Sequence, residues 1–254
     1  MIDSWRSLLD ELARWADAGH TADFWWRDDD ATAPTAPVLR LLALSNATRV
    51  PLALAVIPHD AQAGLLGAND AWVTLLQHGV AHRNLAQPGD KKTEFPAVEP
   101  TSEALGRLAH GRARLAVLFG HRALPVLVPP WNRISAPGLL RDLPAAGYRG
   151  LSRFGPRKAS GGRAGLVQVN THVDVIDWNG TRGFVGVDAA LAQAVAHLQA
   201  RRLGQVDRQE ATGWLTHHAV HDAATWGFLE QLFERTADAR LAVWRSAGEL
   251  FVAP

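Results

Sequence analysis

Short apolar runs alternate with helical patterns along most of the chain, and this alternation restricts the possible folds more than any other feature. Strands that alternate with helices predict βαβ units and a parallel sheet. A chain of 254 residues has the size of a (β/α) barrel, and a doubly wound open sheet is the alternative. The apolar runs are Phe24–Trp26, Leu52–Ile57, Val73–Leu76, Val126–Val128, Tyr148–Ser152, Leu166–Val169, Gly213–Thr216 and Leu241–Trp244. Helical patterns lie at Val38–Ala47, Thr101–Gly120, Ser135–Gly147 and Asp188–Arg202, and from Asp222 onward.

The composition excludes several functional classes. Hydrophobic residues make up 47% and charged residues 20%, which is typical of a globular domain and not of a disordered chain or a coiled coil. Lys+Arg total 26 and Asp+Glu total 25, so the net charge of +1 indicates no nucleic-acid partner and no anionic membrane surface. Cysteine is absent, so a metal ion would have to be bound by His, Asp or Glu.

The N-terminal segment shows no apolar stretch of the kind that a targeting signal requires. Trp5, Leu8, Leu12 and Trp15 fall on one helical face, so residues 1–20 predict an amphipathic helix added to a single domain over residues 1–254. The longest apolar run, Leu52–Ile57, is far too short to span a bilayer. We therefore expect a cytoplasmic protein.

Acidic residues and histidines gather where the expected strands end. In a (β/α) barrel the carboxyl ends of the strands build the active site, so we expect these side chains to meet. They are Asp28, Asp29 and Asp30 after the first run, His78 and His82 after the third, Pro129–Asn132 after the fourth, His172, Asp174 and Asp177 after the sixth, and His217 and His218 after the seventh.

The spacing of His78 and His82 indicates a metal site. Two histidines four residues apart on a helical turn face the same way and suit zinc or a similar ion. Gly79 stands where a zinc-protease helix has Glu, which disfavours that class. The adjacent carboxylates of Asp28–Asp30 repel one another unless a cation, a helix N-terminus or solvent relieves them, so a solvated turn is the alternative interpretation. One Asp and two His leave positions open for water, as in catalytic sites.

A second set of residues suggests acid catalysis and a pocket wall. An extended segment cannot turn both His217 and His218 toward one cavity, and His217 directly follows the apolar run, so we predict His217 as the general acid. Aromatic residues beside the polar strand ends could line a sugar-sized pocket or belong to the core. They are Trp25, Trp26, Trp131, Trp178 and Trp214.

Taken in order, these motifs resemble those of the polysaccharide deacetylases, the NodB-like enzymes of carbohydrate esterase family 4. The family's first motif, Thr-Phe-Asp-Asp-Gly, is similar to Trp26–Asp30, and its second, His-Ser/Thr-x-x-His, to His78–His82. The third, Arg-x-Pro-Tyr, is similar to Val128–Asn132. The fourth, Asp-x-x-Asp-Trp, is similar to Asp174–Trp178, and the fifth, Leu-x-His, to Leu215–His217.

The resemblance implies a distorted or incomplete (β/α) barrel of about seven parallel strands, the NodB type. It implies that Asp28 is the catalytic base and that Asp29, His78 and His82 bind a divalent metal, with Zn²⁺ first and Co²⁺, Ni²⁺ or Mn²⁺ as alternatives. His217 and Asp177 complete the expected catalytic set. The expected substrate contacts are Trp131, Asn132, Trp178, His172 and Asp30.

Three positions depart from the family pattern. Asp30 replaces a Gly, so the base and the metal ligand could instead be Asp29 and Asp30. Gly79 replaces the hydroxyl residue that ties down the metal loop. Val128 stands where the family has the Arg that orients the catalytic Asp, so Arg27 or Arg133 would have to hold the base.

The sequence thus predicts a metal-dependent hydrolase that removes an acetyl group from an N-acetylated sugar or a related amide. A non-catalytic carbohydrate-binding pseudoenzyme is one alternative, which the missing Arg favours. A metal-dependent amidohydrolase of a small cytosolic amide is another, which the N-terminal segment favours. The segment Arg83–Pro100, with Lys91, Lys92 and Phe95, is expected to be either a lid over the pocket or an ordinary surface loop.

Overall fold

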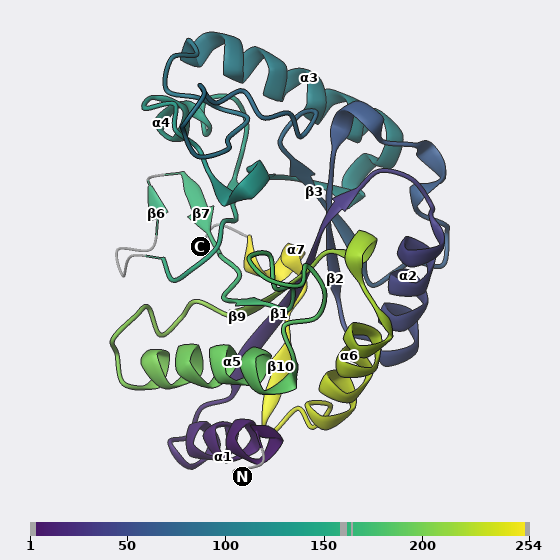
Figure 1. Cartoon of the computed structure of the whole chain (residues 1–254), viewed down its shortest axis with the longest axis vertical. Coiled ribbons are helices and arrows are strands. Elements are labelled where there is room, and N and C mark those ends of the chain that lie inside the picture. The colour runs from purple at the N-terminus through teal and green to yellow at the C-terminus, as the bar shows by residue number, and fades with distance from the viewer. Residues whose placement is uncertain (1–3, 158–161, 164, 252–254) are drawn as a thin grey trace.

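A curled, mainly parallel sheet with helices packed around it forms the body of the protein in the computed structural model (Figure 1). The structure describes residues 4–157, 162–163 and 165–251. The strand order is β6-β7-β5-β4-β3-β2-β1-β9-β8, and β10 also pairs with β1. Each of these pairings is parallel except that of β6 with β7. The predicted fold, an incomplete (β/α) barrel, is therefore confirmed.

The bounds of the elements follow the chain. The strands are β1 (Ala22–Ala31), β2 (Leu52–Val56), β3 (Val73–His78), β4 (Ala123–Val128), β5 (Gly150–Leu151), β6 (Gly162–Arg163), β7 (Leu166–Gln168), β8 (Val173–Asp174), β9 (Thr212–Thr216) and β10 (Ala242–Trp244). The α-helices are α1 (Ser4–Asp17), α2 (Ala36–Thr48), α3 (Thr101–Phe119), α4 (Leu139–Asp142), α5 (Val187–Arg202), α6 (Ala223–Arg235) and α7 (Ala247–Leu250). The short 3-10 helices are η1 (Pro58–Asp60), η2 (Ala63–Leu65), η3 (Gly120–Arg122), η4 (Pro130–Asn132) and η5 (His218–Val220).

Each predicted apolar run coincides with or overlaps a strand, and the structure adds the two-residue strands β6 and β8. These two are too short to show a period in the sequence. The helix expected over Ser135–Gly147 is reduced to the four residues of α4. Pro137 and Pro144 flank α4, and a proline ring is not tolerated inside a longer helix.

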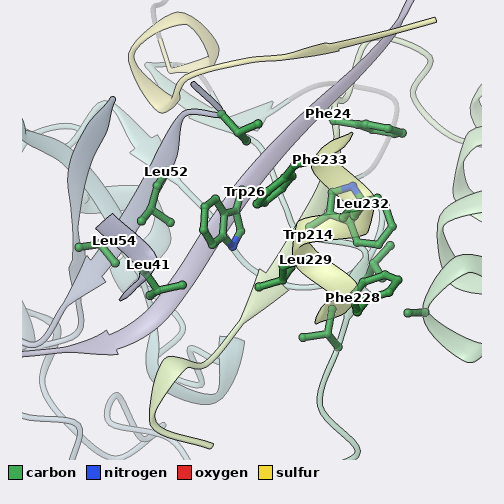
Figure 2. Close-up of a cluster of buried hydrophobic side chains, with 14 of the residues drawn as sticks. Phe24, Trp26, Leu41, Leu52, Leu54, Trp214, Phe228, Leu229, Leu232 and Phe233 are labelled. Carbon is green, nitrogen blue, oxygen red and sulfur yellow. The ribbon is translucent and has the colours of Figure 1, made fainter. Parts of the chain in front are cut away.

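The side chains of β1 alternate between the two faces of the curled sheet. Phe24 and Trp26 belong to the outer core, where Trp26 packs on Phe233 of α6 with ring centroids 4.9 Å apart. Figure 2 shows this cluster, to which α2, α6 and β9 also contribute. Trp25 belongs to a separate cluster inside the barrel, together with Phe251 that follows α7. A strand that is buried on both faces in this way must be a central strand.

The N-terminal helix α1 lies beside α5 (Figure 1). Its Glu11 is fully buried and accepts two hydrogen bonds from Arg202 of α5, at 2.7 and 3.1 Å. The amphipathic helix predicted near the N-terminus is thus present over Ser4–Asp17. The single domain over residues 1–254 stays a prediction. Within the described ranges, no helix has both the length and the apolar character needed to cross a membrane.

Gly213 of β9 permits close packing inside the barrel, and its replacement tests this architecture. A Cβ atom at Gly213 would lie 2.6 Å from the carbonyl oxygen of Asn170 and would collide with the indole of Trp25. We expect Gly213→Ala to lower the free energy of unfolding by about 1–3 kcal/mol, as overpacking does. Denaturant unfolding measures this change.

Gly227 of α6 supplies the matched control, because a Cβ there meets nothing within 4 Å. Gly227→Ala should raise the free energy of unfolding by about 0.5–1 kcal/mol, since alanine favours a helix over glycine. Equal stability changes for the two variants would contradict the packing described for β9.

Candidate functional site

A cavity of about 1050 Å³ opens where the carboxyl ends of the strands meet, at the position that the sequence predicts for the site. Its floor holds acidic residues and histidines, and its walls hold aromatic and basic side chains. The lining residues are Asp29, Asp30, His78, His82, Lys91, Lys92, Trp131, Asn132, Arg133, Phe154, Asp174, Trp178, Asn179, Arg182 and His217.

The three consecutive aspartates of β1 do not share one environment. Asp29 and Asp30 line the cavity, whereas Asp28 does not. The pairing of β1 with β2 shifts register between Asp28 and Ala31, which marks a β-bulge. Asp30 has a φ of 74°, in the left-handed region that few residues other than glycine adopt. A bulge redirects a side chain from its regular strand direction, so Asp30 joins Asp29 in the cavity instead of sharing a face with Asp28.

Asp30 meets the two predicted metal-ligating histidines. Its Oδ1 lies 3.1 Å from Nε2 of His78 and 3.3 Å from Nε2 of His82. The Nδ1 of His78 lies 3.0 Å from the carbonyl oxygen of Val128. A carbonyl only accepts hydrogen bonds, so Nδ1 carries the proton of the neutral ring and the lone pair on Nε2 faces Asp30.

The Asp30 oxygen is itself an unsatisfied buried atom, with no hydrogen-bond partner among the described residues. Lone pairs that converge in this way repel one another unless a cation or a proton lies between them. The three donors are the kind that divalent transition metals accept, and their arrangement leaves a side open to the cavity. Asp30, His78 and His82 therefore fit a divalent cation.

The electrostatics of Asp30 and His78 favour positive charge at the site, whereas the surroundings of His82 favour its neutral form. Burial opposes the ionised form of Asp30, but its contact with His78 outweighs this and lowers the pKa of Asp30. Burial also opposes the charged form of His78, but the carboxylates of Asp29 and Asp30 outweigh it and raise the pKa of His78. For His82, burial and the neighbouring His78 together lower the pKa.

The two histidines do not lie on one helical turn, so that part of the sequence prediction is wrong. His78 is the last residue of β3, and His82 follows in a loop with a φ of 52°. The loop is held by the buried carboxylate of Glu94, which accepts the backbone N–H groups of Val80 at 2.9 Å and Ala81 at 2.8 Å. A Cβ atom at Gly79 would collide with this carboxylate, which explains the glycine. Glu94 thus holds the loop that a hydroxyl residue holds in the family motif.

Arg27 holds Asp29 in the interior of the barrel. Its Nε and Nη2 donate to the two carboxylate oxygens of Asp29 at 2.8 and 2.9 Å. The same guanidinium donates to Ser152 Oγ at 2.6 Å and to Asn132 Oδ1 at 2.9 Å. Both partners of the pair are buried, Arg27 completely and Asp29 to within 2%. Of the two arginines that the sequence offered for orienting an aspartate, the structure brings Arg27 to Asp29.

Asp28 points away from the cavity and toward His218. Its Oδ1 lies 2.5 Å from Nδ1 of His218, and its Oδ2 accepts from the Thr216 hydroxyl at 2.7 Å and the His218 N–H at 3.0 Å. Burial opposes both charges, but each partner outweighs it for the other, so the pKa of Asp28 is lowered and that of His218 is raised. The expectation of a catalytic Asp28 beside a metal-ligating Asp29 is therefore corrected: the structure brings Asp29 and Asp30 to the cavity, which is the alternative that the sequence left open.

His217 faces the cavity, while His218 is taken up by Asp28. The rings of His217 and Trp178 pack nearly perpendicular to each other with centroids 4.7 Å apart, and the indole N–H of Trp178 donates to Asp174 Oδ2 at 2.9 Å. Burial raises the pKa of Asp174, although the charge of His217 opposes this shift. Asp174 and Asp177 belong to the same sequence motif, and the sequence analysis predicted a catalytic role for Asp177 only. Motif spacing alone does not show which of the two aspartates lines the cavity.

The other expected residues divide between the cavity and its supports. Trp131 lines the cavity with its ring centroid 4.5 Å from that of His82, and Asn132 lines it while accepting from Arg27. Asp177 does not line the cavity. Its carboxylate caps a loop by accepting the N–H groups of Gly180 and Thr181 at 2.9 and 3.1 Å.

His172, expected as a substrate contact, lies outside the cavity in a second buried group with His197 and Glu210. The two imidazoles stack with centroids 3.5 Å apart and planes only 13° from parallel. A metal lies in the plane of each ring that binds it, and planes stacked in this way do not meet near the nitrogens. Nδ1 of His172 accepts the N–H of Gly213 at 3.0 Å, which leaves the proton on Nε2, facing Glu210. In this arrangement, these residues do not fit a cation.

Comparison with solved structures finds the same fold in a polysaccharide deacetylase and in carbohydrate esterases of family 4. The structure is similar to a polysaccharide deacetylase from Mycobacterium smegmatis, with a TM-score of 0.62 and 14% identity over 90% of this chain and 88% of that one. It is similar to a family 4 carbohydrate esterase from Streptomyces lividans in complex with acetate, with a TM-score of 0.57 and 18% identity over 92% and 98% of the two chains.

A third similar structure is an acetyl xylan esterase of family 4 from Clostridium thermocellum, which holds a cobalt ion. Its TM-score is 0.53 and its identity 14%, over 90% of each chain. No model of a protein family matches the sequence, and no curated protein does. The resemblance inferred from the motifs is thus confirmed at the level of the fold.

The buried pair of Asp28 and His218 makes stability depend on pH. Asp28→Asn should lower the free energy of unfolding by about 3 kcal/mol near pH 5.5, because it leaves a buried imidazolium without its partner. Because the pKa of Asp28 is lowered in the folded protein, its contribution to stability is fully present above pH 3.8 and is lost in acid. Because the pKa of His218 is raised, its contribution to stability is fully present below pH 6.5 and is lost as the pH rises through the pKa of the folded protein. The difference between wild type and variant should therefore be largest between these values and shrink toward pH 9.

Denaturant unfolding in the presence of a chelator measures this difference without metal binding. Asp10→Asn is the control, because Asp10 forms an exposed pair with Arg6 at 4.0 Å. A stability difference that stays constant from pH 5 to pH 9 would contradict the ion pair.

Proposed function

We propose that this protein is a metal-dependent deacetylase, which hydrolyses the acetamido group of an N-acetylated sugar or a related amide. The observation that carries the proposal is the unpartnered Asp30 oxygen, which lies between two imidazole nitrogens on the floor of the cavity. The fold shared with known deacetylases supports it. A cytoplasmic location stays a prediction.

Asp30, His78 and His82 would hold the cation, with Zn²⁺ preferred because a catalytic zinc site has three nitrogen or oxygen ligands and an open position. When bound, a divalent cation supplies Lewis acidity, which polarises the acetyl carbonyl and lowers the pKa of water at the site to about 7. The Nδ1–H of His78, donating to Val128, fixes the ring so that Nε2 faces the cation.

Asp29 is the proposed general base. A carboxylate oxygen has two lone pairs, and Arg27 uses one on each oxygen, so both oxygens keep one for the proton of the attacking water. Because the guanidinium is bonded on three sides, Asp29 has a fixed orientation. A positioned base of this kind contributes about 10²–10⁴-fold to the rate.

His217 is the proposed general acid, which protonates the leaving amine. Its ring is positioned by Trp178, whose indole N–H is in turn fixed by Asp174 Oδ2 at 2.9 Å. The Nδ1 atom of His217 is buried and has no hydrogen-bond partner among the described residues, so no hydrogen bond at Nδ1 competes with the amine for the ring's proton.

The dimensions and walls of the cavity favour a sugar over a small amide. Its volume of about 1050 Å³ lies at the upper end of the range for small-molecule sites. Trp131, Phe154 and Trp178 offer aromatic surfaces for the apolar face of a sugar ring. The pseudoenzyme alternative was based on the missing Arg at position 128, and Arg27 places a guanidinium on Asp29 instead. No observation now favours that alternative.

The register of the three aspartates gives a direct test. We expect about one divalent ion per chain in the wild type and in Asp28→Asn, and little in Asp30→Ala, as measured by elemental mass spectrometry after incubation with zinc. Asp29→Asn should keep the ion and lose about 10²–10⁴-fold in kcat toward N-acetylated sugars. Metal loss in Asp28→Asn but not in Asp30→Ala, with both variants folded, would contradict the assignment.

Glu94 should control metal affinity without touching the metal. Glu94→Ala leaves two backbone N–H groups of the loop without an acceptor, so His82 loses its fixed position. We expect affinity for zinc to fall about 10–100-fold, as for other residues that support a ligand. Competition with a chromophoric chelator measures this change. Glu103→Ala, at the exposed start of α3, should bind zinc like the wild type. Equal affinities for all three proteins would rule out the supporting role.

A further inference from the structure

Four cationic side chains line the cavity around its acidic floor: Lys91, Lys92, Arg133 and Arg182. They come from three loops, which follow β3, β4 and β8, so they lie on both sides of β1 in the sheet order. Throughout the described ranges, no carboxylate lies within ion-pair distance of any of the four. The whole chain has three lysines, and two of them are at this cavity.

The loop that carries Lys91 and Lys92 is anchored and does not have the character of a swinging lid. Phe95 is completely buried in a core cluster with residues of α3 and α4. Thr93 is also buried, and its hydroxyl donates to the carbonyl oxygen of Arg133 at 3.1 Å. Arg133 in turn donates from Nη1 to the carbonyl oxygen of Lys92 at 2.8 Å. These contacts hold the lysine backbone at the wall of the cavity while the side chains stay exposed.

The loop that carries Arg182 is held from below by Asp177. Besides capping Gly180 and Thr181 with its carboxylate, Asp177 accepts the N–H of Arg182 at its carbonyl oxygen, at 2.8 Å. Arg182 adopts a φ of 58°, a conformation that needs such support in a non-glycine residue. Asp177, which the sequence predicted to be catalytic, therefore acts as a positioning residue for Arg182 beside the cavity.

The charges on the floor do not neutralise these cations. Three aspartates line the cavity, and each has partners other than these cations. Asp29 is paired with Arg27, and Asp30 faces His78 and His82. Asp174 accepts from the indole N–H of Trp178 and from the N–H of Ile176. The four cations, three exposed and Arg133 half-buried, consequently give the cavity mouth a positive potential, which a concave surface focuses. A neutral sugar would leave this charge unused.

We propose that the substrate carries an oxyanion, a phosphate or a carboxylate, in addition to its acetamido group. Lys91, Lys92, Arg133 and Arg182 would bind the anion while the acetamido group lies against Asp29 and Asp30. Arginine suits such an anion because its planar fork can donate two parallel hydrogen bonds, and lysine supplies a point charge. This inference rests on the proposed function, since it concerns the substrate of the same site.

Calorimetric titration of the zinc-loaded protein tests the proposal by binding alone. The probes are N-acetylglucosamine, its 6-phosphate and N-acetylmuramic acid, which separate the neutral, phosphate and carboxylate cases. We expect at least one of the charged sugars to bind about tenfold more tightly than the neutral one, and its advantage to fall with rising ionic strength. The double variant Lys91→Gln/Lys92→Gln should lose most of this advantage.

The double variant Arg6→Gln/Arg240→Gln is the matched control, because it removes the same charge from exposed positions that do not line the cavity. It should keep the preference of the wild type. Equal affinity for the three sugars, or an equal loss in both double variants, would overturn the inference.

Hydrolysis of the same three sugars, measured as released acetate, is a separate readout. Tight binding of a charged sugar with no release of acetate would support the anion site and contradict the deacetylase. Hydrolysis of the neutral sugar with no preference in binding would support the deacetylase and overturn the anion site.

Discussion

The buried ion pair of Arg27 and Asp29 is the interaction on which the cavity depends. A guanidinium inside the barrel is tolerated only when its desolvation is offset by good geometry and by partners for its remaining protons. Here the partners come from β1, from Ser152 at the end of β5 and from Asn132 in η4. Because one side chain joins these three segments, the packing of the strands, the conformation of η4 and the orientation of Asp29 are not independent of one another.

The same strand solves a second electrostatic problem, that of three consecutive carboxylates. Each is given a different partner: His218 for Asp28, Arg27 for Asp29, and the metal-binding pair of His78 and His82 for Asp30. In a regular strand, Asp28 and Asp30 would share a face and repel each other. The bulge between Asp28 and Ala31 separates them and places the third carboxylate at the histidines. The strained backbone of Asp30 thus has a physical purpose in the structure.

The periodic parts of this fold could be predicted from the sequence, whereas the parts set by tertiary register could not. The order of strands and helices follows from local hydrophobic patterns, and the meeting of His78, His82 and His217 follows from the convergence of strand ends. The different partners of Asp28, Asp29 and Asp30 depend on a one-residue bulge in the pairing of β1 with β2, which no local sequence pattern encodes. The role of Glu94 could not be predicted from the sequence, because its contact with Val80 spans 14 residues of irregular loop.

The two groups of paired histidines and a carboxylate show why composition alone does not define a metal site. His172, His197 and Glu210 have the same donor types as His78, His82 and Asp30, and they are more deeply buried. In the first group the rings stack and a backbone N–H occupies Nδ1 of His172, so the lone pairs do not converge. In the second group a carbonyl oxygen accepts from Nδ1 of His78, and Nε2 faces a carboxylate oxygen that lacks a donor. The hydrogen-bond partner of Nδ1 therefore decides which group can bind a cation. That partner comes from a neighbouring strand in both groups, Val128 for His78 and Gly213 for His172.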